Sequence, residues 1–175
     1  VLESRASIMM RLHDIPGVAA IAGAHRARIY IDNTYCTPIF QNPLDLGADM
    51  VMHTLSKYIG GHSDIIGGVL VAKDKVLLEK LSLMRELYGG ILGPMEAWLG
   101  IRGIRTLEVR LRQHEKTALA VAQFLEQHPK VKKVHYPGLP SFPQYDLMQR
   151  QQRGNCGLMS FELDGSVEQA KAFCQ

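Results

Sequence analysis

The chain has 175 residues, enough for one complete hydrophobic core or for one domain and part of another. Hydrophobic residues make up 46% of it and charged residues 21%, as in an ordinary soluble globular protein, and the net charge of +3 gives no reason to expect a nucleic-acid or membrane partner. Three cysteines without Cys-x-x-Cys spacing favour a reduced, cytoplasmic protein, and the short apolar runs predict neither a transmembrane span nor a signal peptide.

Strands and helices alternate along the first 105 residues. The helix expected at residues 14–25 has Asp14 as its N-cap and Pro16 in its first turn. Residues 35–40 are expected to form a loop, and a short helix at residues 43–47 ends at a glycine. Short apolar runs predict strands at residues 1–3, 28–32, 50–52 and 68–72. This alternation predicts an α/β layered fold.

Helices predominate in the middle of the chain, and alternation returns after residue 130. The expected helices cover residues 73–87, 95–100, 104–128 and 144–152, the expected strands cover 131–136 and 158–163, and a last helix begins at Ser166. We assign residues 1–105 to one domain, and residues 106–175 to a bridging helix and the start of a smaller α+β domain. Both ends interrupt an element, so we expect a truncated, internal piece of a longer chain.

Polar side chains gather where two of the predicted strands end. Asp32 closes the second strand, and Thr54, Ser56 and Lys57 follow the third. Ligands bind beyond the carboxyl ends of strands in open α/β sheets, so we expect these groups to share one crevice. Pyridoxal phosphate requires such a set: an amine for a Schiff base, a carboxylate for the ring nitrogen and donors for the phosphate. For Lys57 taken alone, a solvated surface lysine is the alternative.

Four blocks of the sequence resemble the Cys/Met-metabolism family of pyridoxal-phosphate enzymes, which includes cystathionine lyases and synthases and methionine γ-lyases. The family patterns V-D-N-T and S-x-T-K-Y-x-x-G-H-S-D are similar to residues 31–34 and 54–64, and the match continues through residues 102–107 and 135–145. The resemblance covers nearly the whole chain. It implies a fold-type I, aspartate aminotransferase-like large domain with a mostly parallel sheet.

The resemblance also implies a role for each candidate residue. Lys57 would form the Schiff base with the cofactor and later act as a base at the substrate Cα, and Asp32 would face the pyridine nitrogen. Thr54 and Ser56 would bind the phosphate; hydroxyls that satisfy their own turn are the alternative. Two further residues are counted with the cofactor contacts. They are Thr34 and Ser7, and Ser7 departs from the family, which usually has asparagine there.

The activity implied is that of a C–S lyase acting by β- or γ-elimination on cystathionine, methionine or a related small amino acid. A γ-replacement enzyme, such as a cystathionine γ-synthase or an O-acylhomoserine sulfhydrylase, is the first alternative. A catalytically inert, truncated fragment is the second. The family further implies a cytoplasmic homo-oligomer built as a dimer of dimers. The sequence alone does not separate β from γ chemistry or name the sulfur amino acid.

Other residues that suggest chemistry have simpler explanations. The seven histidines lack metal-ligand spacing, so we expect no metal site, and His62 with Asp64 is expected to have a structural hydrogen-bonding role. A basic stripe is interrupted by acidic residues and is expected to be a solvated helix face. Its members are Arg102, Arg105, Arg110, Arg112 and Lys116. Nothing marks Cys36 as reactive.

Overall fold

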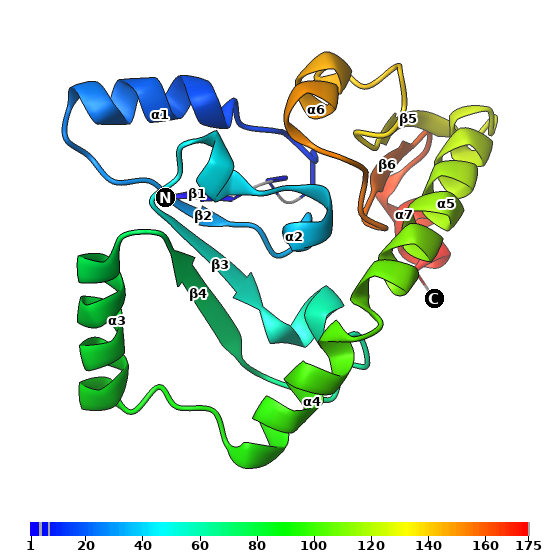
Figure 1. Cartoon of the computed structure of the whole chain (residues 1–175). Helices are drawn as coiled ribbons and strands as arrows, with labels where there is room; N and C mark the ends of the chain where they lie inside the picture. The colour runs from blue at the N-terminus through cyan, green and yellow to red at the C-terminus, as the bar shows by residue number, and fades with distance from the viewer. Residues whose placement is uncertain (4, 7, 175) are drawn as a thin grey trace.

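A four-stranded sheet forms the centre of the first part of the molecule (Figure 1). The computed structural model describes residues 1–3, 5–6 and 8–174. The sheet has the order β1 (Leu2–Glu3), β2 (Tyr30–Asp32), β3 (Met50–Thr54) and β4 (Gly68–Ala72). The first three strands are parallel, and β4 runs antiparallel to β3. The predicted α/β fold with a mostly parallel sheet is therefore confirmed.

Helix α1 (Ile15–Ala24) packs on one face of this sheet (Figure 1). The carboxylate of Asp14 accepts a hydrogen bond from the backbone N–H of Gly17 at 3.2 Å, so the predicted N-cap is confirmed. Ile31 and Val51 alternate with half-buried residues along their strands and are buried in one cluster with Ile15. This alternation places Asp32 and Thr54, with Tyr30, Met50 and Met52, on the opposite, half-buried face of β2 and β3.

The loop predicted at residues 35–40 is wrong in part, because α2 (Thr37–Phe40) is a single helical turn. Pro38 stands in its first turn, where the missing proline N–H costs nothing and the fixed φ favours a helix. The buried side chain of Phe40 anchors the turn in the core. The 3₁₀ helix η1 (Pro43–Leu46) follows, and it ends at Gly47 as predicted.

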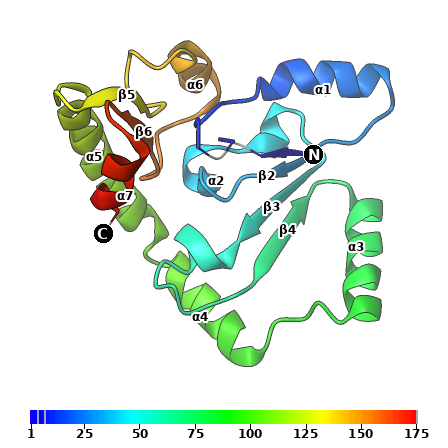
Figure 2. The same ribbon diagram turned by 180° about the vertical axis from the view of Figure 1, so that it is seen from behind.

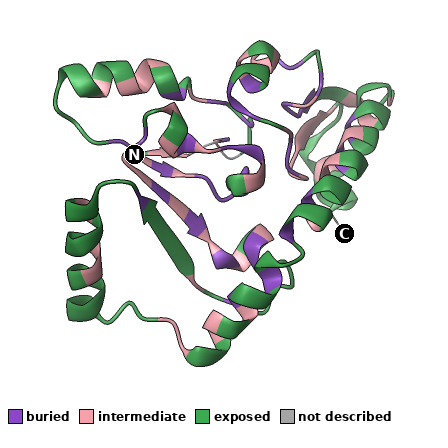
Figure 3. Cartoon of the chain, viewed as in Figure 1, coloured by how far each residue is buried: buried purple, intermediate pink, exposed green. Residues whose placement is uncertain are grey.

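A π-helical turn, η2 (Leu55–Ile59), follows β3 directly and contains Lys57. After β4 come α3 (Lys75–Tyr88) and α4 (Pro94–Ile104). Four of the five residues of β4 are exposed, and α3 has no buried residue. Both elements are mostly green, the colour of exposed residues, in Figure 3. Large apolar side chains on α3, such as Leu87 and Tyr88, are therefore exposed.

Helix α5 (Leu107–Glu126) leads to a second, separate sheet (Figure 2). This sheet pairs β5 (Val131–His135) with β6 (Ser160–Leu163) in antiparallel fashion, and α6 (Tyr145–Gln151) and α7 (Val167–Phe173) complete the region. One face of α5 packs on β5 through a buried cluster of five residues. They are Ala118, Ala122, Val134, Tyr136 and Leu139. Each part thus has its own sheet, while the domain boundary at residue 105 stays a prediction.

Within the described part of the chain, no helix is long and apolar enough to cross a lipid bilayer. The same residues contain no group of three or more His, Cys, Asp or Glu side chains that could hold a metal ion.

Candidate active site

The carboxyl ends of β2 and β3 lie side by side, and the predicted site residues that the structure describes lie on these strand ends or on the segments that follow them. Asp32 pairs with Met52 in the parallel register. Since side chains alternate along a strand, Asp32 and Thr54 project from the same face of the sheet. Both side chains are half-buried, whereas Val51 and His53 on the other face of β3 are buried. The structure therefore brings the ends of the aspartate strand and the lysine strand to one edge.

Thr34 links these two strand ends by hydrogen bonds. Its backbone N–H donates to Oδ1 of Asp32 at 2.9 Å, and its Oγ1 accepts from the backbone N–H of Thr54 at 3.0 Å. Thr34 is buried, so both bonds are shielded from water. The role that the structure gives Thr34 is to join the segment after β2 to the end of β3. Contact with a cofactor stays a prediction.

Lys57 lies in the η2 turn with its side chain exposed. Its backbone dihedrals are φ −105° and ψ −120°, outside the helical region, although the residues around it form a helical turn. Hydrogen bonds close the turn on both sides of the lysine. Gly60 N–H donates to the Leu55 carbonyl and Gly61 N–H to the Lys57 carbonyl, each at 2.8 Å. Single π-turns of this kind are frequent at functional sites.

The two hydroxyls before Lys57 differ in their surroundings. Oγ1 of Thr54 donates to the Gly67 carbonyl at 3.1 Å and accepts from the Ser56 backbone N–H at 3.3 Å, so it caps its own turn. A phosphate contact from Thr54 would require its hydroxyl proton to leave Gly67. Ser56 is half-buried at the start of the turn. The phosphate role of both residues stays a prediction, and Ser7 lies outside the described residues.

Burial sets the protonation of two groups beside the site. It lowers the pKa of His53, although the carboxylate of Asp32 opposes this shift. Burial also raises the pKa of Tyr58, the residue after Lys57. The Tyr58 hydroxyl accepts a hydrogen bond from the backbone N–H of Gly157 at 3.0 Å, which docks the lysine turn onto the second part of the chain. His62 has the expected structural bond, from its Nδ1 to the Gly60 carbonyl oxygen at 2.9 Å.

The contacts of Arg110 were not predicted, and its predicted place on a solvated helix face is wrong. The side chain is half-buried on α5 and donates hydrogen bonds to the carbonyls of Tyr58 and Ile59, at 2.7 and 3.3 Å. The charge pattern predicted an exposed arginine, because a helix with interspersed acidic and basic residues normally faces water. The nearby glycines Gly61 and Gly103 were the available signal for close packing at this point.

A buried polar network behind Asp32 was also missed. The guanidinium of Arg5 is fully buried and donates to Gln152 Oε1 at 2.7 Å, to Asn155 Oδ1 at 2.8 Å and to the Cys156 sulfur at 3.2 Å. Gln152 Nε2 in turn donates to the side chain of Gln41 at 2.7 Å.

Gln41 continues this network to the strand end. Its Nε2 donates to Asn33 Oδ1 at 3.3 Å, and Asn33 directly follows Asp32. The side chain of Asn33 also donates to the carbonyls of Thr37 and Gln41, at 3.2 and 2.9 Å. Polar groups in such a network fix one backbone arrangement, because each would be costly to bury unpaired. The position of the aspartate therefore depends on residues near both ends of the chain.

The groups at this edge fit the chemistry of pyridoxal phosphate. An exposed amine (Lys57), a half-buried carboxylate (Asp32) and a half-buried hydroxyl (Ser56) stand on adjoining segments of one sheet edge. The carboxylate matches a protonated ring nitrogen, the amine matches an aldehyde, and the hydroxyl is a neutral donor for phosphate.

Comparison with known proteins agrees with this chemistry. The family model described as Cys/Met metabolism PLP-dependent enzyme matches residues 1–175. The chain is 42% identical over 174 residues to a cystathionine gamma-lyase of Dictyostelium discoideum, with 99% of this chain and 45% of the relative covered. It is 43% identical over 173 residues to an L-methionine gamma-lyase of Pseudomonas putida, with 98% and 43% covered.

A solved structure gives the same result for the fold. The cystathionine gamma synthase from Xanthomonas oryzae pv. oryzae, in complex with aminoacrylate and cysteine, superimposes with a TM-score of 0.96 and 41% sequence identity. The match covers 99% of this chain and 45% of that structure. The chain thus spans less than half the length of each of these three proteins.

Proposed function

Because this chain belongs to the family of Cys/Met metabolism PLP-dependent enzymes, we propose that the complete enzyme is a pyridoxal-phosphate-dependent C–S lyase. Its substrate is a small sulfur amino acid, such as cystathionine or methionine, which loses its sulfur group by β- or γ-elimination. Relatives named cystathionine gamma-lyase and L-methionine gamma-lyase support this class of reaction.

One structural observation carries the proposal. β2 and β3 are adjacent and parallel, and Thr34 ties the carboxylate of Asp32 to the last residue of β3, directly before the Lys57 turn. An acid and an amine on neighbouring strand ends can bind opposite parts of one small ring.

Each residue has a proposed role in the reaction. Nζ of Lys57 would hold the cofactor by its aldehyde and, when free, would take the proton from the substrate Cα. Asp32 would face the ring nitrogen and favour its protonated form, and Ser56, with Thr54, would hold the phosphate. Bound pyridoxal phosphate supplies the electron sink for the charge left on Cα.

A replacement reaction is the second candidate. The matching structure from Xanthomonas oryzae pv. oryzae is named a cystathionine gamma synthase, and its title names aminoacrylate and cysteine as bound molecules. A synthase would need the same lysine and aspartate, because both reactions begin with loss of the Cα proton. Product analysis of the complete enzyme with cystathionine, methionine and cysteine separates the two candidates.

We also propose that the complete enzyme is a cytoplasmic homo-oligomer, built as a dimer of dimers.

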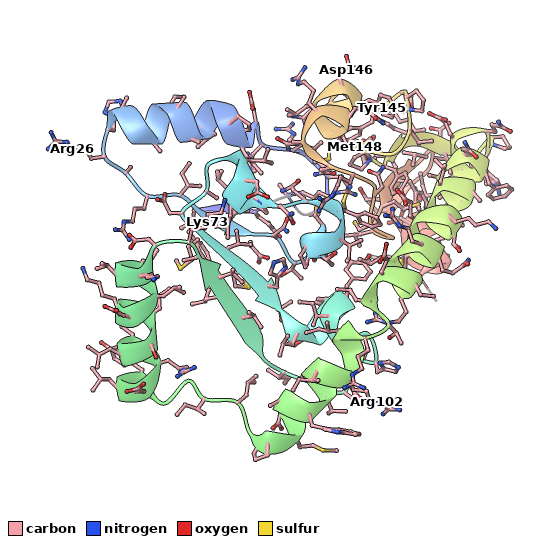
Figure 4. The ribbon with its side chains drawn as sticks, viewed as in Figure 1. Arg26, Lys73, Arg102, Tyr145, Asp146 and Met148 are labelled. Carbon is pink, nitrogen blue, oxygen red and sulfur yellow. The ribbon has the colours of Figure 1, made fainter. Side chains whose placement is uncertain are left out.

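The Lys57→Ala variant of the complete enzyme tests the assignment. Borohydride reduction fixes a lysine–pyridoxal bond, and we expect the variant to lose both the visible absorption of that bond and the reduced product at position 57. Lys73→Ala is the matched control, since Lys73 is an exposed lysine at the far end of β4 that pairs with Asp45 (Figure 4). A Lys57→Ala protein that keeps the full chromophore would refute the assignment.

A further inference from the structure

The guanidinium of Arg110 holds the end of the turn that contains Lys57. It donates to the carbonyls of Tyr58 and Ile59, the two residues that follow the lysine. The last carbonyls of a short helical turn have no partner within the turn. A planar guanidinium with several fixed donors can satisfy two of them at once.

Arg110 is itself held in place by the junction of α4 and α5. Its Nε donates to Thr106 Oγ1 at 3.1 Å, and its Nη2 donates to the Gly103 carbonyl at 2.8 Å. Four hydrogen bonds therefore restrain one side chain. Since Gly103 belongs to α4 and Thr106 is the N-cap of α5, the side chain connects the helix junction to the lysine turn.

Two glycines make this close approach possible. A Cβ at Gly61 would collide with Nη1 of Arg110, and a Cβ at Gly103 would collide with the carbonyl oxygen of Ile59. Gly61 also has a φ of 77°, which other residues rarely adopt. The contact between the helix junction and the turn is thus backbone-to-backbone, with Arg110 filling the remaining gap.

We propose that Arg110 is a positioning residue for Lys57; this inference rests on the proposed function. Lys57 departs from helical dihedrals inside its turn, so its direction depends on how the residues on either side are fixed. Before it, Leu55 N–H donates to the Gly67 carbonyl at 2.9 Å; after it, Arg110 binds Tyr58 and Ile59. Arg110 does not touch the reacting atoms and acts through the backbone of the turn.

Three variants of the complete enzyme weaken the contact between Arg110 and the lysine turn to different degrees. Arg110→Met removes every donor, and Arg110→Lys keeps the charge but loses the planar set of guanidinium donors. Thr106→Val removes the acceptor for Nε together with the hydroxyl's own bond to the Gly103 carbonyl, at 3.4 Å. Arg102→Met is the matched control, because Arg102 is an exposed arginine on α4 that projects away from the sheet over Trp98 (Figure 4). All four proteins are first compared by melting temperature.

Two measurements then test whether Arg110 holds the turn and whether it positions Lys57. Hydrogen exchange of the peptide covering residues 55–61, in protein without cofactor, reports whether the turn is held. We expect Arg110→Met to exchange at least about tenfold faster there, with Thr106→Val and Arg110→Lys between it and the control. The rate at which added pyridoxal phosphate becomes borohydride-trapped on Lys57 reports the lysine position, and we expect it to fall at least about fivefold in Arg110→Met.

The two measurements separate a positioning role for Arg110 from a purely structural one. Faster exchange with unchanged trapping makes Arg110 a purely structural residue and overturns the proposal, as does an equal loss of trapping in Arg102→Met. Unchanged exchange also overturns it. A wild-type protein that traps no cofactor at Lys57 refutes the proposed function and the positioning role with it, while the exchange data still show whether Arg110 holds the turn.

Discussion

The backbone N–H of Thr54 donates a hydrogen bond to Oγ1 of Thr34 at 3.0 Å. Thr54 is the last residue of β3, and Thr34 lies two residues after the end of β2. The backbone N–H of Thr34 in turn donates to Oδ1 of Asp32. One threonine thus joins the two strand ends beyond the three-residue pairing of β2 with β3. The Asn33 N–H, which donates to the Met52 carbonyl at 2.9 Å, supports the same arrangement.

Thr34→Val should loosen that cross-link. Valine has nearly the same shape but no acceptor, so the Thr54 N–H would lose its partner at a part-buried position. We expect the free energy of unfolding to fall by about 1–2 kcal/mol and pyridoxal phosphate to bind more weakly. Denaturant titration and cofactor binding would measure the two effects. Thr34→Ser, which keeps the oxygen, is the control, and equal behaviour of the two variants would contradict the prediction.

Asp32→Asn should separate cofactor retention from turnover. The amide oxygen can still accept the bond from the Thr34 N–H, so the strand ends should keep their arrangement. Without a negative charge, however, the ring nitrogen is not kept protonated, and we expect turnover to fall about 100-fold or more. Absorbance of bound cofactor and the rate of elimination would be measured together. Unchanged turnover would remove Asp32 from the mechanism.

Gln152→Leu should be among the more destabilising single changes outside the core. The leucine removes the acceptor that lies 2.7 Å from the buried guanidinium of Arg5 and also the donor to Gln41. Leaving buried polar groups unpaired should cost about 2–3 kcal/mol of unfolding free energy. Gln149→Leu is the matched control, since Gln149 is exposed on α6, the helix that ends directly before Gln152. Similar melting temperatures for the two variants would show that the network contributes little.

His53 should make stability depend on pH. Burial lowers its pKa below the ordinary value of 6.5, so the unfolded chain takes up a proton more readily than the folded one. The contribution to stability is therefore fully present above pH 6.5 and is lost as the pH falls through the folded-state pKa. Between about pH 7.5 and pH 5.5, the melting temperature of His53→Gln should fall less than that of the wild type. His25→Gln, at an exposed position, should behave like the wild type.

Local signals predicted most of the fold. The cap at Asp14 and the capping box at Ser166 are each complete within four residues of sequence, and both helices begin where these residues predict. The apolar run before Lys57 likewise predicted a strand that ends at a polar cluster, as β3 and the η2 turn show. These features depend on neighbours along the chain, which the sequence displays directly.

The contacts that hold the site together could not be predicted in this way. Arg110 meets the carbonyl of Tyr58 across 52 residues, and nothing in the periodicity of α5 distinguishes it from the exposed Arg112. Family resemblance identified Lys57 and Asp32 as candidates but not the groups that orient them. The helical turn at α2 was missed because a proline suggested a loop, whereas the burial of Phe40 favoured a helix.

Arg5 and its partner Gln152 are separated by 147 positions. During translation the arginine is therefore made long before the glutamine whose side-chain oxygen accepts its hydrogen bond. Until then the guanidinium keeps its hydration shell, since stripping it without acceptors would be costly. The segment around Arg5 should consequently reach its final place late in folding, because its hydrogen bonds depend on this distant loop closure.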